Sequence, residues 1–154
     1  MKTDECAEGR INLPRLPELA DPVLRFDLPK EIEKLHTKES WGREAGRSSE
    51  TLVKQDNFRV VLISMKAKTR MGEHRAEGRI SIQTLQGRIC IHLRDQQIEL
   101  PAGRLLALDC GLHHDVESLE ESAFLLTMSL PDKHEAGHSA KATSDDLPKA
   151  SDRE

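Results

Sequence analysis

Two histidines, His74 and His114, have the type and position to do chemistry in this chain. A neutral imidazole carries one nitrogen lone pair, which can accept a hydrogen bond or ligate a divalent metal. The two stand forty positions apart in a stretch of alternating strands, where a small barrel would point both rings inward. Two imidazoles alone fall short of the three or four protein ligands of a stable metal site. The pair therefore predicts a polar pocket in a barrel and leaves the reaction open.

Alternation of apolar residues predicts the strands that would position this pair. The run that begins at Phe58 is apolar on both parities, which is typical of a strand buried on both faces. Shorter alternating runs bounded by turn residues predict five further strands, over residues 79–85, 88–94, 97–100, 104–108 and 123–130. In the first of these, Ile80, Ile82 and Thr84 share one face, which we expect to be interior. Short strands without intervening helices indicate an all-β sandwich or barrel of about seven or eight strands.

A short amphipathic helix is predicted ahead of the barrel, over residues 29–39 approximately. Asp27 can cap its N-terminus, and Pro29 suits the first turn because its missing N–H would lack a helical partner there. Ile32 and Leu35 fall on one face of this helix. We expect that face to pack against the barrel.

The chain is expected to divide into three parts. Residues 1–50 form an N-terminal extension that contains the helix, and Trp41 should fasten the helix to the outside of the barrel. The glycines and serines of residues 42–49 predict a flexible join. Residues 51–131 form the barrel domain, whereas residues 132–154 are polar, charged and poor in large aliphatic side chains, which predicts a disordered tail.

Composition narrows the range of partners. The 154 residues carry a formal net charge of -4, so the chain lacks the basic surface that binds nucleic acid through its phosphates. No run of about eighteen apolar residues predicts a membrane span, and the first ten residues do not resemble a secretory signal. Three cysteines without C-x-x-C spacing argue against a disulfide framework. We expect a cytoplasmic protein that binds neither nucleic acid nor membrane.

Around the first histidine, the sequence resembles motif one of the cupin superfamily, whose RmlC-like members are double-stranded β-helix, or jelly-roll, barrels. That motif runs from a histidine, past one residue, to a second histidine, then to a glutamate and a glycine. In this chain His74 takes the first position and Gly87 the last. Ala76 and Ile80 occupy the places of the second histidine and the glutamate.

Around the second histidine, the sequence resembles motif two of the same superfamily. Gly103, Gly111 and His114 match in identity and spacing, while Asp109 and Ser118 stand where proline and asparagine would be. The resemblance covers residues 58–130, approximately. It implies an all-β cupin barrel with a short N-terminal helix, and small cupins often form homodimers through edge strands, so we also expect a homodimer.

In metal-binding cupins the two motifs together supply three histidines and a glutamate to a divalent metal. This chain keeps His74 and His114, whereas the side chains of Ala76 and Ile80 donate no electron pairs. Glu77 is the one candidate for a third ligand of iron, manganese, nickel or zinc. The resemblance therefore implies either no cofactor or a divalent metal on an incomplete ligand set.

The carboxylates adjacent to the histidines are expected to face away from them. Glu73 and Asp115 are sequence neighbours of His74 and His114, and neighbouring residues of a strand point to opposite faces. His113 is likewise expected to face outward, and His92 to lie on the outer surface of the barrel. These four side chains would then not complete a metal site with the pair.

Three functions remain open at this point. The first is a cupin-domain protein that binds a small molecule in its barrel as a sensory or accessory module. The second is a metal-dependent enzyme, an oxygenase or isomerase, and the third is a structural dimer without a ligand. Whether the chain is an enzyme is left open. The residues expected to line the pocket are His74, Ile80, Ile82, Leu108 and His114.

Overall fold

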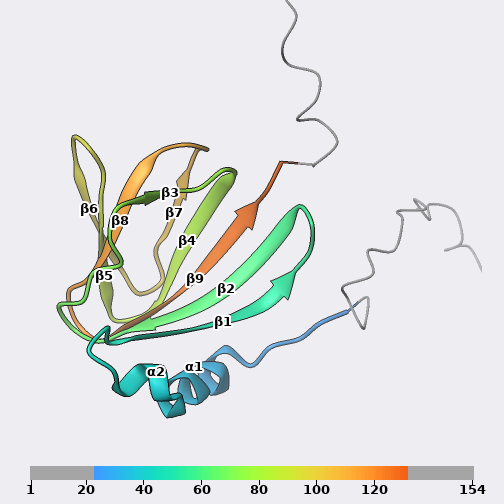
Figure 1. Ribbon diagram of the computed structural model, residues 1–154, viewed down its shortest axis with the longest axis vertical. Coiled ribbons are helices and arrows are strands. Elements are labelled where there is room, and N and C mark those ends of the chain that lie inside the picture. The colour runs from blue at the N-terminus through green and yellow to red at the C-terminus, as the bar shows by residue number, and fades with distance from the viewer. Residues whose placement is uncertain (1–22, 132–154) are drawn as a thin grey trace, which may run out of the picture.

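The computed structural model describes residues 23–131, which form two antiparallel sheets with two helices on one side (Figure 1). The larger sheet has the strand order β1-β2-β9-β4-β7, and the smaller has the order β3-β8-β5-β6. The elements are α1 (Leu28–Thr37), α2 (Glu39–Gly42), β1 (Arg47–Lys54), β2 (Phe58–Met65), β3 (His74–Arg75), β4 (Arg79–Gln86), β5 (Arg88–His92), β6 (Gln97–Pro101), β7 (Leu105–Leu108), β8 (His113–Ser118) and β9 (Ser122–Ser129). The predicted all-β jelly roll with an N-terminal helix is confirmed.

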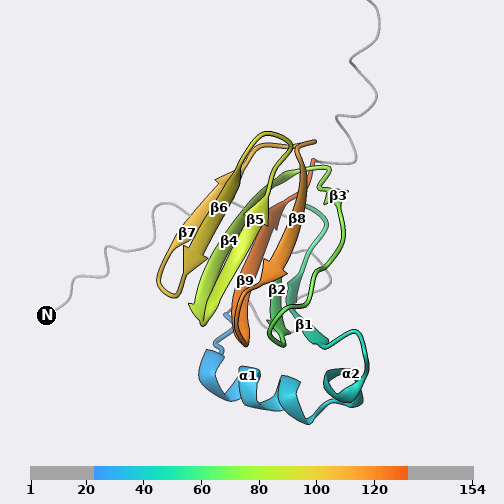
Figure 2. The ribbon, with the colours of Figure 1, turned by 90° about the vertical axis from the view of Figure 1, so that its left-hand side faces the viewer.

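The two sheets face one another and enclose the barrel core (Figure 2). Ile80, Ile82 and Thr84 of β4 are at most 4% exposed, as the alternation predicted. The buried members of the core cluster come from both sheets and are Ile63, Met65, Ile80, Ile82, Ile89, Ile91, Leu100, Leu108, Val116 and Phe124. The strands predicted from apolar alternation therefore meet along their apolar faces.

Strand β2 is buried on both faces at its C-terminal end, which confirms the interpretation of its apolar run. It lies between β1 and β9 in the large sheet. Ile63 points into the barrel core, whereas Leu62 belongs to a second cluster with Ile32 and Leu35 of α1. One strand thus joins the barrel core to the helix layer.

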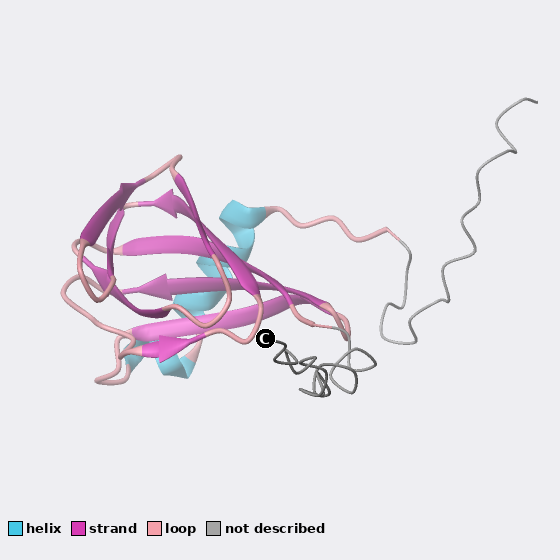
Figure 3. Ribbon diagram, turned by 90° about the horizontal axis from the view of Figure 1, so that it is seen from above, coloured by secondary structure: helices cyan, strands magenta, loops and turns pink. Residues whose placement is uncertain are grey.

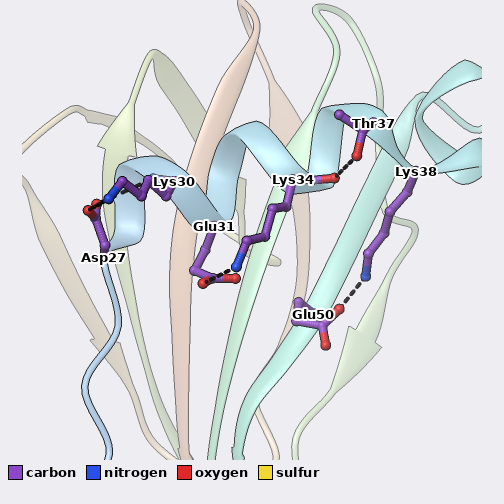
Figure 4. A network of polar contacts seen from close by, with 7 residues as sticks. All are labelled: Asp27, Lys30, Glu31, Lys34, Thr37, Lys38 and Glu50. Carbon is purple, nitrogen blue, oxygen red and sulfur yellow. Dashed lines mark hydrogen bonds and ion pairs between the residues drawn. The ribbon is translucent and has the colours of Figure 1, made fainter.

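Helix α1 begins at the predicted cap. The Asp27 side chain accepts a hydrogen bond from the backbone N–H of Lys30, and Pro29 lies in the first turn. Figure 4 shows the polar residues along this helix, including Lys34, which donates to Glu31 at 2.8 Å. The helix ends at Thr37. The next residue, Lys38, has an extended backbone, and its ammonium group pairs with Glu50 of β1. Polar contacts and the buried Ile32–Leu35 face together fix α1 against the large sheet.

Trp41 of α2 lies between the helices and the end of β2, as expected. Its ring stacks on His36 of α1 with ring centroids 4.2 Å apart. The Lys66 ammonium lies 5.5 Å from the centroid of the indole ring, within the range of a cation–π contact. The tryptophan therefore holds the helix pair to the barrel, and Figure 3 shows the helices confined to one side of the strands.

Strand β1 begins inside the segment that was predicted to be a flexible join, residues 42–49, so that prediction is wrong for the end of the segment. Residues 47–49 are already β-strand, and the predicted domain division at residue 51 falls inside β1. The strand pairs with β2 from Arg47 opposite Met65 to Lys54 opposite Arg59. Polar residues suit this position because β1 is an edge strand of the large sheet. The described part of the chain has nine strands, more than the seven or eight predicted.

Gly87 makes the tight turn between β4 and β5, at the predicted turn. Its φ of +72° lies in the left-handed region, which glycine adopts without steric cost. A Cβ at this position would lie 2.3 Å from the carbonyl oxygen of Glu121. The last glycine of the first motif is therefore required by backbone geometry.

Two expectations fall outside the described residues. These are the first part of the predicted N-terminal extension, residues 1–22, and the disordered tail predicted for residues 132–154. Between them, no helix has the length and apolar character needed to cross a membrane.

Candidate functional site

The two histidines face each other on paired strands of the small sheet. His74 of β3 lies directly opposite His114 of β8 in the antiparallel register. Their ring centroids are 4.3 Å apart, and the rings meet edge to face at 61°. The structure therefore brings together the pair that the sequence analysis singled out.

Backbone hydrogen bonds fix the tautomer of both rings. Nδ1 of His74 lies 2.8 Å from the carbonyl oxygen of Gly72, and Nδ1 of His114 lies 2.9 Å from that of Leu112. A carbonyl oxygen can only accept, so each Nδ1 carries the proton and donates it. In a neutral ring the Nε2 atom then holds the free lone pair. Neither Nε2 atom has a hydrogen-bond partner among residues 23–131.

Burial disfavours the protonated form of the His114 ring. The residue is 2% exposed, and desolvation lowers its pKa below the usual histidine value, with a smaller lowering from the neighbouring His74. Within residues 23–131, the fully buried side-chain polar atoms without a hydrogen-bond partner belong to His36, Arg59 and Ser64. The His114 Nε2 has no partner either but does not belong to this group, so it is not fully buried. The small exposed part of the ring therefore includes this nitrogen. His74 is exposed, so the pair presents one inner and one outer acceptor.

The three apolar residues expected to line the pocket belong to the packed core. Ile80 is 4% exposed, Ile82 is 1% exposed and Leu108 is 6% exposed. Ile80 lies opposite Leu108 in the pairing of β4 with β7. All three pack with the other members of the core cluster. Their place as pocket lining remains a prediction, because the two cavities described below are lined by other residues.

The donor set around the pair does not fit a resident metal. Ala76 packs against the core and Ile80 is part of it, so neither position supplies a ligand. Glu77 is exposed and makes no hydrogen bond or ion pair with His74 or His114. Within residues 23–131 there is no group of three histidine, cysteine, aspartate or glutamate side chains that could hold a metal. Two imidazoles alone are too few for the usual protein ligand set.

The neighbouring carboxylates face the opposite side of β8, as predicted. Asp115 accepts hydrogen bonds from the side chain of Arg70 and from the backbone N–H of Gly72. Glu73 lies 3.1 Å from Nδ1 of His113, which also faces outward. These contacts lie on the outer surface of the small sheet, whereas His114 lies on its inner surface. The strand alternation thus separates the carboxylates from the histidine pair.

A polar cavity of about 440 Å³ opens on that outer surface. Arg70, Asp115, His92 and Arg94 are among its lining residues. His92 lies there as expected, with Nε2 2.6 Å from a Glu117 carboxylate oxygen. Most of the charged groups in this cavity are already paired with one another, so it has little unbalanced charge.

A second cavity of about 400 Å³ lies at the β1 side of the molecule. Its apolar lining comes from Val61 and Ile63 of β2 and from Met71, in the loop before β3. Its polar lining includes Lys38 and Arg47. The sequence analysis missed this site, because its residues come from four separate segments that share no motif.

The comparisons with known proteins show the fold. No family model and no curated protein matches the sequence significantly. A cupin superfamily protein from Desulfitobacterium hafniense has a TM-score of 0.60 and 22% identity, over 76% of this chain and 99% of its own. A protein of unknown function from Streptococcus pyogenes has a TM-score of 0.58 and 18% identity, over 76% and 95%. A cupin-2 domain protein from Shewanella frigidimarina has a TM-score of 0.55 and 15% identity, over 68% and 93%.

Proposed function

Because the chain has the cupin fold, we propose that it binds a small molecule at the His74–His114 pair, as a sensory or accessory module. The observation that carries this proposal is the pair of Nε2 atoms, each with a free lone pair and no partner in the described region. Unpaired acceptors at the end of an apolar core are suited to orienting a ligand.

The chemistry of the pair specifies the ligand class. Two Nε2 acceptors require hydrogen-bond donors, such as the hydroxyl groups of a sugar or polyol or the N–H groups of an amine or amide. Ile80, Ile82 and Leu108 would supply the apolar wall behind the pair. A ligand that satisfies both acceptors would reach His114 through the small exposed part of its ring, which includes Nε2.

A thermal-shift screen of neutral sugars, polyols and small amides tests this proposal. A ligand that binds only the folded chain raises the melting temperature by mass action. We expect at least one donor-bearing compound to stabilise the wild type and to lose its effect in His74→Ala. His74 is exposed, so the substitution should leave the fold intact. His113→Ala, on the outer surface, is the matched control. The absence of any stabilising compound, or an equal shift in His74→Ala, would contradict the proposal.

Elemental analysis separates this proposal from a metal-dependent enzyme. In that alternative, His74 and His114 would hold iron, manganese, nickel or zinc with Glu77 as the third ligand. We expect protein purified without a metal-affinity tag to contain no near-stoichiometric transition metal, because the donor set is incomplete. A stoichiometric metal that is lost in His74→Ala would overturn the metal-free proposal.

A further inference from the structure

The cavity at the β1 side differs in charge from the cavity on the outer surface of the small sheet. Its lining contains Lys38 and Arg47 and no carboxylate. The outer cavity, by contrast, includes Glu73 and Asp115 as well as its arginines. The β1 cavity is therefore the electropositive one of the two.

Arg47 carries the unbalanced charge of this cavity. Lys38 is paired with Glu50 and also donates to the Ser49 carbonyl oxygen at 3.0 Å. The Arg47 guanidinium has no carboxylate partner in the described region, and its NH1 donates to the Met71 carbonyl oxygen at 3.2 Å. That hydrogen bond holds the guanidinium beside the apolar lining and leaves its other N–H groups available.

The cavity also has an apolar lining, which comes from Val61, Ile63 and Met71. Val61 and Ile63 lie on the face of β2 that points to the barrel core, and Ile63 is 5% exposed. Met71 packs against the same core, and its flexible thioether can adapt to a bound apolar group. The hydroxyl of Ser49 has no side-chain partner in the described residues and adds a neutral donor. The lining thus combines hydrogen-bond donors with aliphatic surface.

We propose that this cavity binds a small monocarboxylate with an apolar tail, with the carboxylate on Arg47 and the tail on Val61 and Met71. A guanidinium matches a carboxylate through two parallel hydrogen bonds, and these charge-assisted bonds are stronger than neutral ones. A volume of about 400 Å³ accommodates an acid of about six carbons. The lining of this cavity does not include the histidine pair. The two sites also differ in the ligand groups that they recognise, because the histidine pair accepts hydrogen bonds whereas Arg47 donates them.

Titration calorimetry of the full chain with hexanoate tests this assignment. We expect saturable binding to the wild type, weaker binding of 1-hexanol, which lacks the charge, and weaker binding of acetate, which lacks the tail. Arg47→Gln should weaken hexanoate binding by about tenfold or more, the effect expected for loss of one charge-assisted hydrogen-bond pair. Arg47 is exposed, so an unchanged melting temperature should show that the fold is retained.

Two further variants make the test specific. Arg94→Gln removes an exposed arginine from the outer cavity and should leave hexanoate binding unchanged. Val61→Ser should weaken hexanoate more than acetate, because only hexanoate has a tail that contacts this wall. Failure of hexanoate to bind, or equal binding by Arg47→Gln, would overturn the proposal. Neither result bears on the histidine pair, because hexanoate has no donor for its Nε2 atoms.

Discussion

The burial of His114 predicts a pH dependence of stability. Desolvation lowers its pKa below 6.5, the ordinary value, with the His74 ring adding to that effect and Asp115 opposing it. Below pH 6.5 the unfolded chain takes up a proton that the folded chain resists, so the free energy of unfolding falls as the pH falls. In His114→Leu this contribution is absent. Urea unfolding from about pH 7.5 to about pH 5.5 should therefore show a weaker pH dependence for His114→Leu than for the wild type.

The neighbouring histidine provides the control for that experiment. His113 is exposed and points to the other face of β8, so His113→Leu should retain the pH dependence of the wild type below pH 6.5. A His114→Leu curve parallel to that of the wild type would show that the buried ring does not resist protonation.

Individual residues were predictable where strand alternation governs them. The inward position of His114 and the outward positions of His113 and Asp115 follow from period-two geometry alone. The tautomers depend on the carbonyl oxygens of Gly72 and Leu112, which the sequence does not place. The Arg47 cavity needs four segments in contact, so no local pattern could indicate it.

At the scale of elements, Gly78 comes just before β4 and lies against the last residue of β9, Ser129. A Cβ at this position would lie 1.7 Å from the Ser129 carbonyl oxygen, so the β9 backbone would have to move. We expect Gly78→Ala to lower the free energy of unfolding by more than about 1 kcal/mol, measured by urea denaturation. Gly42→Ala is the control, because nothing lies within 4 Å of a Cβ there. Equal midpoints for the two variants would refute this expectation.

Strands were predictable where their inward positions are apolar, as in β2 and β4. Strand β8 escaped prediction because its inward positions hold His114, Val116 and Ser118, of which two are polar. Strand β1 escaped because it is mostly polar, and its pairing with β2 is a long-range feature that local alternation does not record. The two-residue β3 exists only through its pairing with β8.

At the scale of the whole molecule, β7 is the edge strand that lacks protection against pairing. The edge β1 carries charged residues and a bulge, β3 has two residues, and β6 contains a glutamate and a proline. Strand β7 reads LLAL, and Leu105 is 61% exposed. Natural edge strands usually carry charges, bulges or prolines that prevent association. We propose that β7 of a second copy covers this edge in a homodimer.

Light scattering after size exclusion tests the homodimer. We expect a dimer for the wild type and about tenfold or more weaker self-association for Leu105→Lys, because burying one leucine contributes about 1.5–3 kcal/mol. Glu99→Lys on the edge β6 changes charge without touching β7 and should remain dimeric. A monomeric wild type would exclude the dimer, and a dimeric Leu105→Lys would place the contact elsewhere.

The place of β2 between β1 and β9 also constrains how the chain folds during synthesis. Its first neighbour, β1, leaves the ribosome just before it, but its second neighbour, β9, is the last strand of residues 23–131 to emerge. Until Ser129 pairs with Phe58, one edge of the β1–β2 hairpin has no neighbouring strand. The apolar side chain of Ile63 is then not yet covered by the barrel core. Such pairing of distant segments slows folding and prolongs the exposure of apolar surface. The β1–β2 hairpin is therefore the part of the large sheet that waits longest for its second neighbour.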